Sequence, residues 1–175
     1  KVLFEGANAA LLDIDHGTYP FVTSSNASTG GIASGTGMAP ATIDDTFGVV
    51  KASSTRVGEG PFPTELAGDA VERLRKAGNE FGSTTGRPRR CGWFDAVAVR
   101  YGQKVSGTTR LVITNLDVLS GFDPLPICVA YEMGGVRSDQ FPAFDIETAK
   151  PIYEELPGFH EDITEVRQFD DLPAT

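Results

Sequence analysis

Residues 111–131 read LVITNLDVLSGFDPLPICVAY, and this stretch decides which fold class the sequence favours. It begins with the apolar run 111–114 and ends with the apolar run 127–131, with turn residues between them. Short apolar runs bounded by turn residues are consistent with buried strands. Residues 46–52 (TFGVVKA) and 1–5 have the same character. We therefore predict a strand in each of these runs.

Two segments between these runs predict helices. In residues 66–77, apolar side chains recur at helical spacing, charged residues occupy the other face, and Gly78 follows as a stop. Residues 93–101 show the same spacing from Trp93 onward. Strands that alternate with helices predict an α/β fold with a largely parallel sheet and flanking helices. We find no repeat and place no internal boundary, so residues 1–175 are expected to form part of one domain.

Composition limits the partners of the chain. Its 24 Asp and Glu residues outnumber its 15 Lys and Arg residues, which gives a formal net charge of −9 and a pI near 4.6. This charge repels nucleic acid and anionic membranes, so we expect neither as a partner, and a local basic cluster must hold any bound anion. Cys91 and Cys128 form no disulfide framework and indicate a reducing compartment, so we expect a cytoplasmic location. No apolar stretch approaches the roughly 20 residues that span a bilayer.

A basic segment is the strongest candidate for anion binding. Residues 82–93 (GSTTGRPRRCGW) hold arginines at positions 87, 89 and 90. Arginine pairs bidentately with carboxylate or phosphate, and the neighbouring threonine hydroxyls and glycine amides add neutral donors. The alternative is a solvated basic loop or a signal that a partner protein reads. The acidic background of the chain favours the interpretation of this segment as an anion clamp.

An acidic segment near the N-terminus has two interpretations. Residues 11–18 (LLDIDHGT) place two carboxylates and one imidazole close together, which could serve acid/base chemistry or a metal site. The alternative is that these side chains cap or bridge the backbone at a turn, as Asp and His more often do. Residues 23–37 then form a polar loop that could wrap a phosphate, but it lacks the Gly-Lys-Ser/Thr of a P-loop.

Two loops follow predicted strands. Residues 55–64 (TRVGEGPFPT) form a loop bounded by prolines with one more arginine, and a structural crossover turn is its simpler interpretation. Asp117 comes just after the strand at 111–114. A carboxylate there can accept two hydrogen bonds from the N1/N2 edge of guanine. The alternative is that Asp117 caps a helix.

Taken together, these segments resemble the adenylosuccinate synthetase family, whose members use GTP to join aspartate to IMP. The resemblance runs through residues 4–8, 11–26, 51–64 and 84–93, in order and with consistent gaps. It implies a P-loop-GTPase-like α/β fold that is incomplete in this chain, because the family's chain is more than twice as long. The absent parts are a Gly-rich phosphate loop with the catalytic aspartate, the histidine that acts as general acid, and a further guanine-contacting loop.

The resemblance also implies roles for individual residues. The IMP-binding positions are Asn8, Thr23 and Arg87. The aspartate-binding positions are Val57, Ser83, Thr84, Thr85, Gly86, Arg87 and Arg89. The GTP-binding positions are Arg89, Asn115, Leu116 and Asp117. The family usually has Lys where Asn115 stands, so this residue bears on guanine affinity more than on guanine preference.

The function implied by the resemblance is that of a GTP-dependent C–N ligase of AMP biosynthesis, acting through 6-phosphoryl-IMP. GTP is the co-substrate, and Mg²⁺ is expected to be bound mainly by parts absent from this chain. The resemblance places no catalytic residue and no metal ligand within residues 1–175, so we expect the chain alone to be inactive. It implies a homodimer for the full-length parent. The alternative function is a noncatalytic module that binds a nucleotide or another anion.

Overall fold

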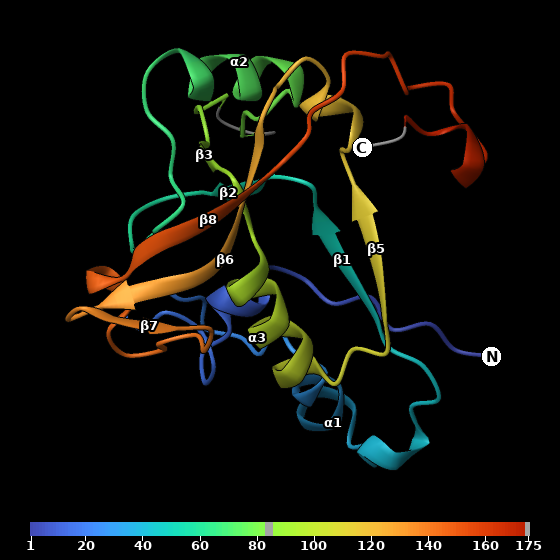
Figure 1. Cartoon of the computed structure of the whole chain (residues 1–175). Coiled ribbons are helices and arrows are strands. Elements are labelled where there is room, and N and C mark those ends of the chain that lie inside the picture. The colour runs from blue at the N-terminus through green and yellow to red at the C-terminus, as the bar shows by residue number, and fades with distance from the viewer. Residues whose placement is uncertain (83–85, 174–175) are drawn as a thin grey trace.

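The structure is a computed structural model that describes residues 1–82 and 86–173 (Figure 1). Residues 1–46 form loops around three short helical elements and contain no strand. These elements are η1 (Ala10–Leu12), α1 (Gly30–Thr36) and η2 (Pro40–Thr42). The strand predicted at residues 1–5 is therefore wrong: the segment is irregular and exposed, and no described strand pairs with it. An apolar run becomes a strand only where a neighbour supplies the backbone hydrogen bonds.

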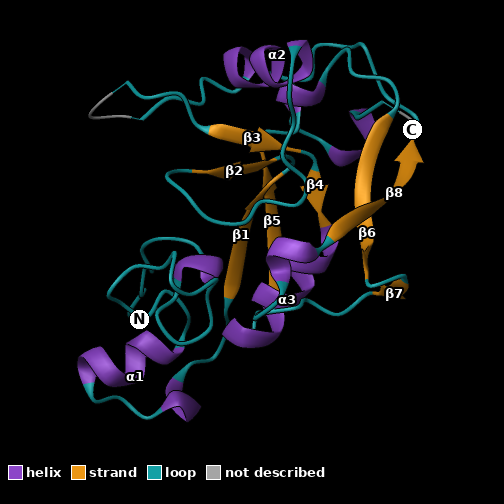
Figure 2. Cartoon of the chain, turned by 90° about the vertical axis from the view of Figure 1, so that its left-hand side faces the viewer, coloured by secondary structure: helices purple, strands orange, loops and turns teal. Residues whose placement is uncertain are grey.

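A pair of parallel strands follows, β1 (Phe47–Lys51) and β5 (Arg110–Thr114) (Figure 2). In their register Val49 lies opposite Val112, and Lys51 lies opposite Thr114. The predictions at 46–52 and 111–114 are confirmed to within one residue at each end. Parallel strands need a long connection between them, and the elements from β2 to α3 supply it.

The first part of this connection contains an antiparallel pair and a helix. β2 (Ser54–Arg56) pairs with β3 (Arg90–Gly92). Between them lies α2 (Asp69–Ala77), which confirms the helix predicted at 66–77 but begins later, after Gly68 with its positive φ of 68°. Acidic residues in its first turn and basic residues in its last turn complement the helix dipole. Leu74 of α2 is fully buried and anchors the helix to the core.

The second helix is α3 (Ala96–Ser106), where the sequence predicts a helix at 93–101. It begins three residues later than predicted because Asp95 is its N-cap, accepting a hydrogen bond from the Ala98 N–H at 3.0 Å. Just before it, β4 (Phe94–Asp95) pairs in parallel with β6 (Leu125–Met133). Strand β6 contains the predicted strand at 127–131.

Strand β6 is the centre of a curved, mostly antiparallel sheet that lies to the left of β1 and β5 in Figure 1. It pairs antiparallel with β7 (Val136–Ser138) and with β8 (Lys150–Leu156). The predicted α/β class is confirmed. The sheet is less parallel than expected, because among the described strands only β1–β5 and β4–β6 pair in parallel, whereas β2–β3, β6–β7 and β6–β8 pair antiparallel.

Two apolar clusters form the core. One lies between α2 and the C-terminal segment, with Leu74, Phe122 and Phe159 among its buried members. The other lies between α3 and β6 and includes Val97 and Tyr131. The Tyr131 hydroxyl donates to Asp95 at 2.6 Å inside this cluster, and burial raises the pKa of the Asp95 carboxyl. Asp95 is thus a buried helix cap and not a surface site. Within the described residues, no helix is both long and apolar enough to cross a membrane.

Candidate functional site

The carboxyl ends of β1 and β5 lie side by side, at Lys51 and Thr114, because the two strands run parallel. Residues 52–64 lead away from the end of β1 through β2, and Asn115 follows β5 directly. In open α/β sheets ligands bind at this edge, because the connecting loops gather there. The structure therefore places the predicted guanine-reading segment at this edge, and the predicted loop at 55–64 begins four residues after the end of β1.

Asn115 turns the chain sharply after β5. Its φ is +59°, in the left-handed region, which Asn tolerates better than most residues other than glycine. The turn places Asp117 at the start of η3 (Asp117–Leu119). Val118 and Leu119 are buried and anchor this turn, whereas Asp117 is exposed. Asp117 therefore presents its carboxylate at the surface from a firmly held turn.

A hollow of about 320 Å³ lies beside Asp117. The C-terminal segment supplies its other walls, and its lining residues are Leu116, Asp117, Ile163, Thr164, Val166 and Leu172. The volume is at the lower end of the range for small-molecule pockets. Walls that combine aliphatic side chains with polar groups and one carboxylate suit a flat heterocycle that carries N–H donors at one edge. The hollow therefore fits the guanine interpretation of Asp117 chemically.

Glu80 ties the end of β1 to the basic segment. Its carboxylate is 4% exposed and accepts from Lys51 Nζ at 2.5 Å and from the Arg89 guanidinium at 2.8 Å. The Arg89 backbone N–H also donates to the Glu80 carbonyl at 3.0 Å. A buried carboxylate is costly unless it is paired, so these contacts hold Arg89 by both its backbone and its side chain. Glu80 is not among the residues predicted from sequence, because an isolated acidic residue after a helix carries no signal of burial.

Arg89 keeps donors that Glu80 does not use. A guanidinium carries five N–H groups. The Arg89 Nε is buried and has no hydrogen-bond partner among residues 1–82 and 86–173. The buried Nε cannot reach a ligand, so an anion would contact the terminal Nη groups of this side chain, which is 30% exposed.

Arg90 and Arg56 hold loops together. Arg90 forms two hydrogen bonds with the Glu65 carboxylate, at 2.7 and 2.5 Å, and donates to the carbonyls of Gly58 and Gly60. The hydrogen bond to Glu65 raises the pKa of Arg90. Arg56 donates to the carbonyls of Phe21 and Glu59 and to a threonine hydroxyl. The predicted clamp of three arginines is therefore reduced to Arg87 and Arg89, because Glu65 neutralises Arg90.

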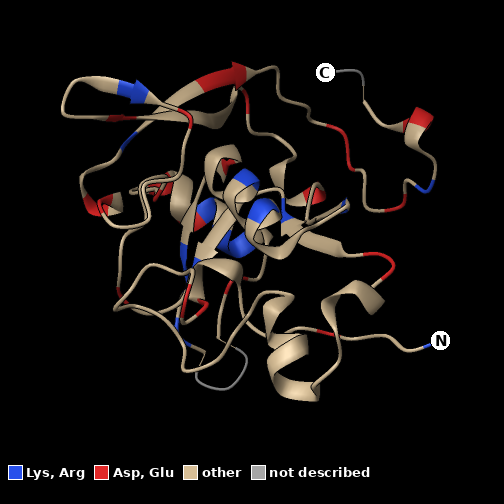
Figure 3. Ribbon diagram, turned by 90° about the horizontal axis from the view of Figure 1, so that it is seen from below, with Lys and Arg blue, Asp and Glu red and all other residues tan. Residues whose placement is uncertain are grey.

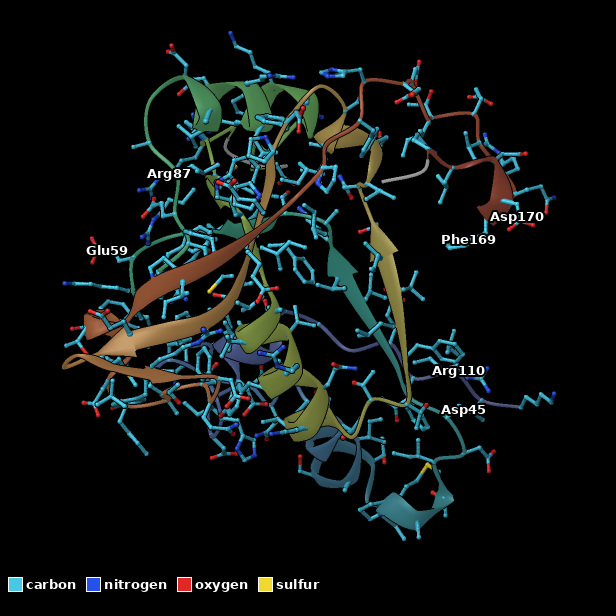
Figure 4. The ribbon with its side chains drawn as sticks, in the orientation of Figure 1. Asp45, Glu59, Arg87, Arg110, Phe169 and Asp170 are labelled. Atoms are coloured by element: carbon cyan, nitrogen blue, oxygen red, sulfur yellow. The ribbon has the colours of Figure 1, made fainter. Side chains whose placement is uncertain are left out.

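Arg87 lies exposed in the loop between α2 and β3 (Figure 4). The loop is closed at its base by a hydrogen bond from the Gly82 N–H to the Arg87 carbonyl, at 2.8 Å. Gly86 turns the chain back with a φ of +64°. Ser83, Thr84 and Thr85, which are predicted to bind aspartate, lie outside the described residues.

Val57, the remaining predicted aspartate-binding residue, is 64% exposed in the loop after β2. It directly precedes Gly58, whose carbonyl accepts from Arg90. Arg90 therefore attaches this loop to the basic segment that carries Arg87 and Arg89. The predicted aspartate-binding loops are thus neighbours along β2 and β3, although their side chains do not form a closed pocket among the described residues.

Two of the three predicted IMP-binding residues, Asn8 and Thr23, lie on either side of η1 in the sequence. Asn8 lies just before it, exposed, with a positive φ of 66°. The Thr23 backbone N–H donates to the Leu12 carbonyl, and the Thr23 hydroxyl contacts the Ser25 hydroxyl at 2.6 Å. Asn8 and Thr23 therefore belong to one loop cluster, which Arg56 joins to β2 through its bond to the Phe21 carbonyl.

The acidic segment 11–18 is structural at its centre. Asp13 is fully buried and accepts backbone N–H bonds from Asp15 and His16 on one oxygen, and from Ala27 and Ser28 on the other. Burial alone raises the pKa of a carboxyl group, but these four donors lower the pKa of Asp13 to about 2. The interpretation that this carboxylate bridges the backbone is confirmed. The described residues also contain no cluster of three or more His, Cys, Asp or Glu residues that could hold a metal ion.

Replacement of Asp13 by Asn should lower the free energy of unfolding by about 1–2 kcal/mol at pH 7, since an amide offers one acceptor oxygen where the carboxylate offers two. The native pKa lies below the usual value of 3.8, so the charged form contributes stability above about pH 4 and loses it as the pH falls towards 2. Urea unfolding from pH 7 to pH 3 measures this, with Asp44→Asn as the control, because Asp44 is an exposed aspartate outside this turn. A destabilisation that does not shrink as the pH falls would contradict the role of the Asp13 charge.

Comparison with known proteins decides the family. All of residues 1–175 match the family model of adenylosuccinate synthetase. The chain belongs to the adenylosuccinate synthetase family. The synthetase of Exiguobacterium sibiricum is 58% identical over 175 residues, and that of Nocardioides sp. is 59% identical over the same length. Each match covers 99% of this chain but only 41% and 40% of those relatives, so the chain spans about two fifths of their length.

A solved structure of the same family shares the fold. It is the fully ligated adenylosuccinate synthetase from Plasmodium falciparum, which matches with a TM-score of 0.92 and 44% identity. The match covers 97% of this chain and 41% of that one. The arrangement of the described elements is therefore that of a segment of an adenylosuccinate synthetase.

Proposed function

We propose that residues 1–175 form part of a GTP-dependent ligase that joins L-aspartate to IMP to make adenylosuccinate, the precursor of AMP. The match of the whole chain to the adenylosuccinate synthetase family carries this proposal. The position of Asn115, Leu116 and Asp117 directly after β5, and the link from Arg89 through Glu80 to Lys51 at the end of β1, support it. The chain's share of the active enzyme is ligand binding and orientation.

The proposed chemistry has two steps. The γ-phosphoryl group of GTP is transferred to O6 of IMP, forming the O6–P bond and releasing GDP. The aspartate amine then attacks C6, and the C6–O6 bond breaks as O6 leaves with the phosphate. Phosphoryl transfer depends on positioning and on neutralising charge, and aspartate adds two carboxylates to a site already rich in phosphate oxygens. Arginines that bind carboxylate or phosphate oxygens offset this repulsion.

The proposed roles follow the sites. Asp117 binds guanine through its N1–H and N2 amino groups, with Asn115 and Leu116 beside it, and Arg89 reaches the nucleotide. Arg87 binds a carboxylate of aspartate, near the residues at 57 and 83–86. Asn8 and Thr23 bind IMP from the cluster around η1. We also propose a homodimer and a cytoplasmic location for the full-length parent.

The resemblance gives Mg²⁺ no ligand within residues 1–175, and Mg²⁺ on a nucleotide is typically held by the phosphates, water and one or two protein carboxylates. We therefore assign no magnesium ligand to this chain and derive no step through the ion. In the parent enzyme the nucleotide phosphates and residues outside this chain would hold it.

A chimaera tests the proposal. Residues 1–175 replace the matching stretch of the Exiguobacterium sibiricum synthetase, and adenylosuccinate is measured with GTP, IMP and aspartate. We expect turnover within about tenfold of the unaltered relative, and no turnover by residues 1–175 alone, which supply binding groups but no general acid or base. A folded chimaera without turnover would leave only the alternative of a noncatalytic binding module. Turnover by residues 1–175 alone would contradict the proposal that this chain binds the ligands while the rest of the enzyme supplies the general acid and base.

Glu80 is a positioning residue in this scheme, since it holds Arg89 and Lys51 without facing a ligand itself. In the chimaera, Glu80→Gln should raise the KM for GTP about tenfold with a smaller change in kcat, the scale of one charged hydrogen bond. Exposed Glu155→Gln on β8 is the matched control. A lower kcat at an unchanged KM for GTP would contradict this role. So would an effect of Glu80→Gln no larger than that of Glu155→Gln.

A further inference from the structure

The guanidinium of Arg56 lies between two loops for which different ligands are proposed. Arg56 is the last residue of β2, and the loop that follows it is the one proposed to bind aspartate. Its Nε donates to the Glu59 carbonyl of that loop at 2.9 Å. Its Nη2 donates to the Phe21 carbonyl and to the Thr18 hydroxyl, each at 3.2 Å, in the cluster proposed to bind IMP. One side chain therefore joins both loops.

The IMP-binding side of this link is firmly held. Thr18 is 2% exposed, and both its backbone N–H and its hydroxyl donate to the Leu11 carbonyl, at 2.9 and 3.3 Å. The Thr23 N–H donates to the Leu12 carbonyl at 2.8 Å. Because Leu11 and Leu12 both belong to η1, Thr18 and Thr23 are attached to the same short helical element. A contact made by Thr18 is therefore connected to the residue proposed to bind IMP.

On the aspartate-binding side, two arginines hold consecutive carbonyls. Arg90 donates to the carbonyls on either side of Glu59, at 3.3 and 2.8 Å, and Arg56 donates to the Glu59 carbonyl itself. Gly60 has a φ of +105°, and a Cβ there would clash with Arg56 Nη2 and lie 2.7 Å from Phe21 Cβ. The absence of a side chain at Gly60 therefore leaves the space through which the guanidinium reaches Phe21.

The charge of Arg56 has no carboxylate partner among residues 1–82 and 86–173, since its three acceptors are two carbonyls and a hydroxyl. The side chain is half-buried, and burial together with nearby Arg90 lowers the pKa of Arg56. A partly buried charge is costly unless it is paired. In Figure 3 the Lys and Arg residues gather near the middle of the view, whereas many Asp and Glu residues lie along outer loops. An unpaired cation between these loops favours anions there, and both proposed ligands are anions.

We propose that Arg56 is a positioning residue that couples the IMP-binding cluster to the aspartate-binding loop, so that bound IMP holds residues 57–60 in place for aspartate. The identity of the two ligands rests on the proposed function. The coupling itself does not require turnover, because it concerns the effect of IMP on a loop. Misplacement of a substrate by about 1 Å can cost about 100-fold in rate, so a link that fixes both loops serves catalysis.

Amide hydrogen exchange in the chimaera, with and without saturating IMP, tests the coupling. We expect IMP alone to slow exchange in residues 57–60 at least about fivefold. Arg56→Lys should abolish this effect, because lysine keeps the charge but lacks the planar fork that reaches both loops. Arg100→Lys is the matched control, since Arg100 also donates to a distant carbonyl, that of Val129, at 3.0 Å.

Calorimetry establishes whether IMP is bound in each sample. Bound IMP that leaves exchange in residues 57–60 unchanged would overturn the proposal. So would an equal effect of IMP in the unaltered and Arg56→Lys chimaeras. Protection of residues 57–60 without turnover would support the coupling while contradicting the ligase function, whereas a chimaera that binds no IMP would contradict both.

Steady-state kinetics give a second readout. Arg56→Lys should raise the KM values for aspartate and IMP about tenfold each, with a change below about twofold in the KM for GTP. Gly60→Ala should give the same pattern, because its Cβ displaces the guanidinium. Gly58→Ala is the matched control: its φ of +78° is also positive, but nothing lies within 4 Å of its Cβ, so the KM for IMP should not change. Equal changes in all three KM values for Arg56→Lys, or equal KM values for IMP in the two glycine variants, would contradict the proposal.

Discussion

Replacing Asp117 by Asn in the chimaera should reduce the use of GTP relative to xanthosine triphosphate by about 100-fold. The carboxylate offers two acceptor oxygens to the two N–H groups of the guanine edge, whereas Asn places an amide donor against them. A site built to hydrogen-bond a ligand discriminates strongly when that pairing is lost. The exposed position of Asp117 beside a hollow gives this carboxylate access to a base. Competition between GTP, ATP and xanthosine triphosphate measures the change.

Asn115→Lys is the matched variant for this experiment. A Lys stem can lie over the purine face, so we expect tighter GTP binding without a change in which base is preferred. The left-handed φ of +59° favours Asn over Lys at this position and limits the gain. Altered base preference on changing Asn115, or unaltered preference on changing Asp117, would make the turn at 115–117 merely structural.

Replacing Arg87 by Leu should weaken aspartate use by about 30-fold or more, equivalent to about 2 kcal/mol, because a charged hydrogen bond to a bound ion is lost. Arg87 is exposed at the base of a closed loop, so the substitution leaves the core untouched. The steady-state KM for aspartate and kcat measure the effect, and the KM for GTP should change less.

Arg137→Leu on β7 controls for the loss of one exposed positive charge. We expect it to leave aspartate use unchanged. If Arg87→Leu also leaves both the aspartate KM and kcat unchanged, then Arg87 does not bind aspartate.

The elements with strong local patterns were predictable from sequence. The apolar runs at 46–52, 111–114 and 127–131 are strands, and the periodic run at 66–77 is a helix, because spacing and turn residues agree there. Residues 1–5 have the same apolar character but pair with no described strand. An apolar run does not show by itself whether a neighbouring strand will pair with it. The start of α3 was missed because the capping role of Asp95 is a tertiary feature as well as a local one: Tyr131, far along the chain, shares that carboxylate.

The sequence was enough to predict which segments contribute to the candidate site, but not which side chains in them contact one another. The sequence marks Asp117 and the basic segment by residue type and position. It does not show that Glu65 neutralises Arg90 while Glu80 orients Arg89, because these partners come from different elements. Likewise, the four backbone donors to Asp13 come from two separate turns. The sequence of residues 11–18 alone therefore fits both a catalytic site and a carboxylate that bridges the backbone.

The fate of one oxygen atom tests the proposed function most directly. The chimaera is supplied with GTP, aspartate and IMP that carries ¹⁸O at O6, and the inorganic phosphate is analysed by mass spectrometry. If O6 is phosphorylated and then displaced by the aspartate amine, each phosphate released with adenylosuccinate carries one ¹⁸O atom. Adenylosuccinate formed with unlabelled phosphate, or GTP hydrolysis without adenylosuccinate, would contradict the account.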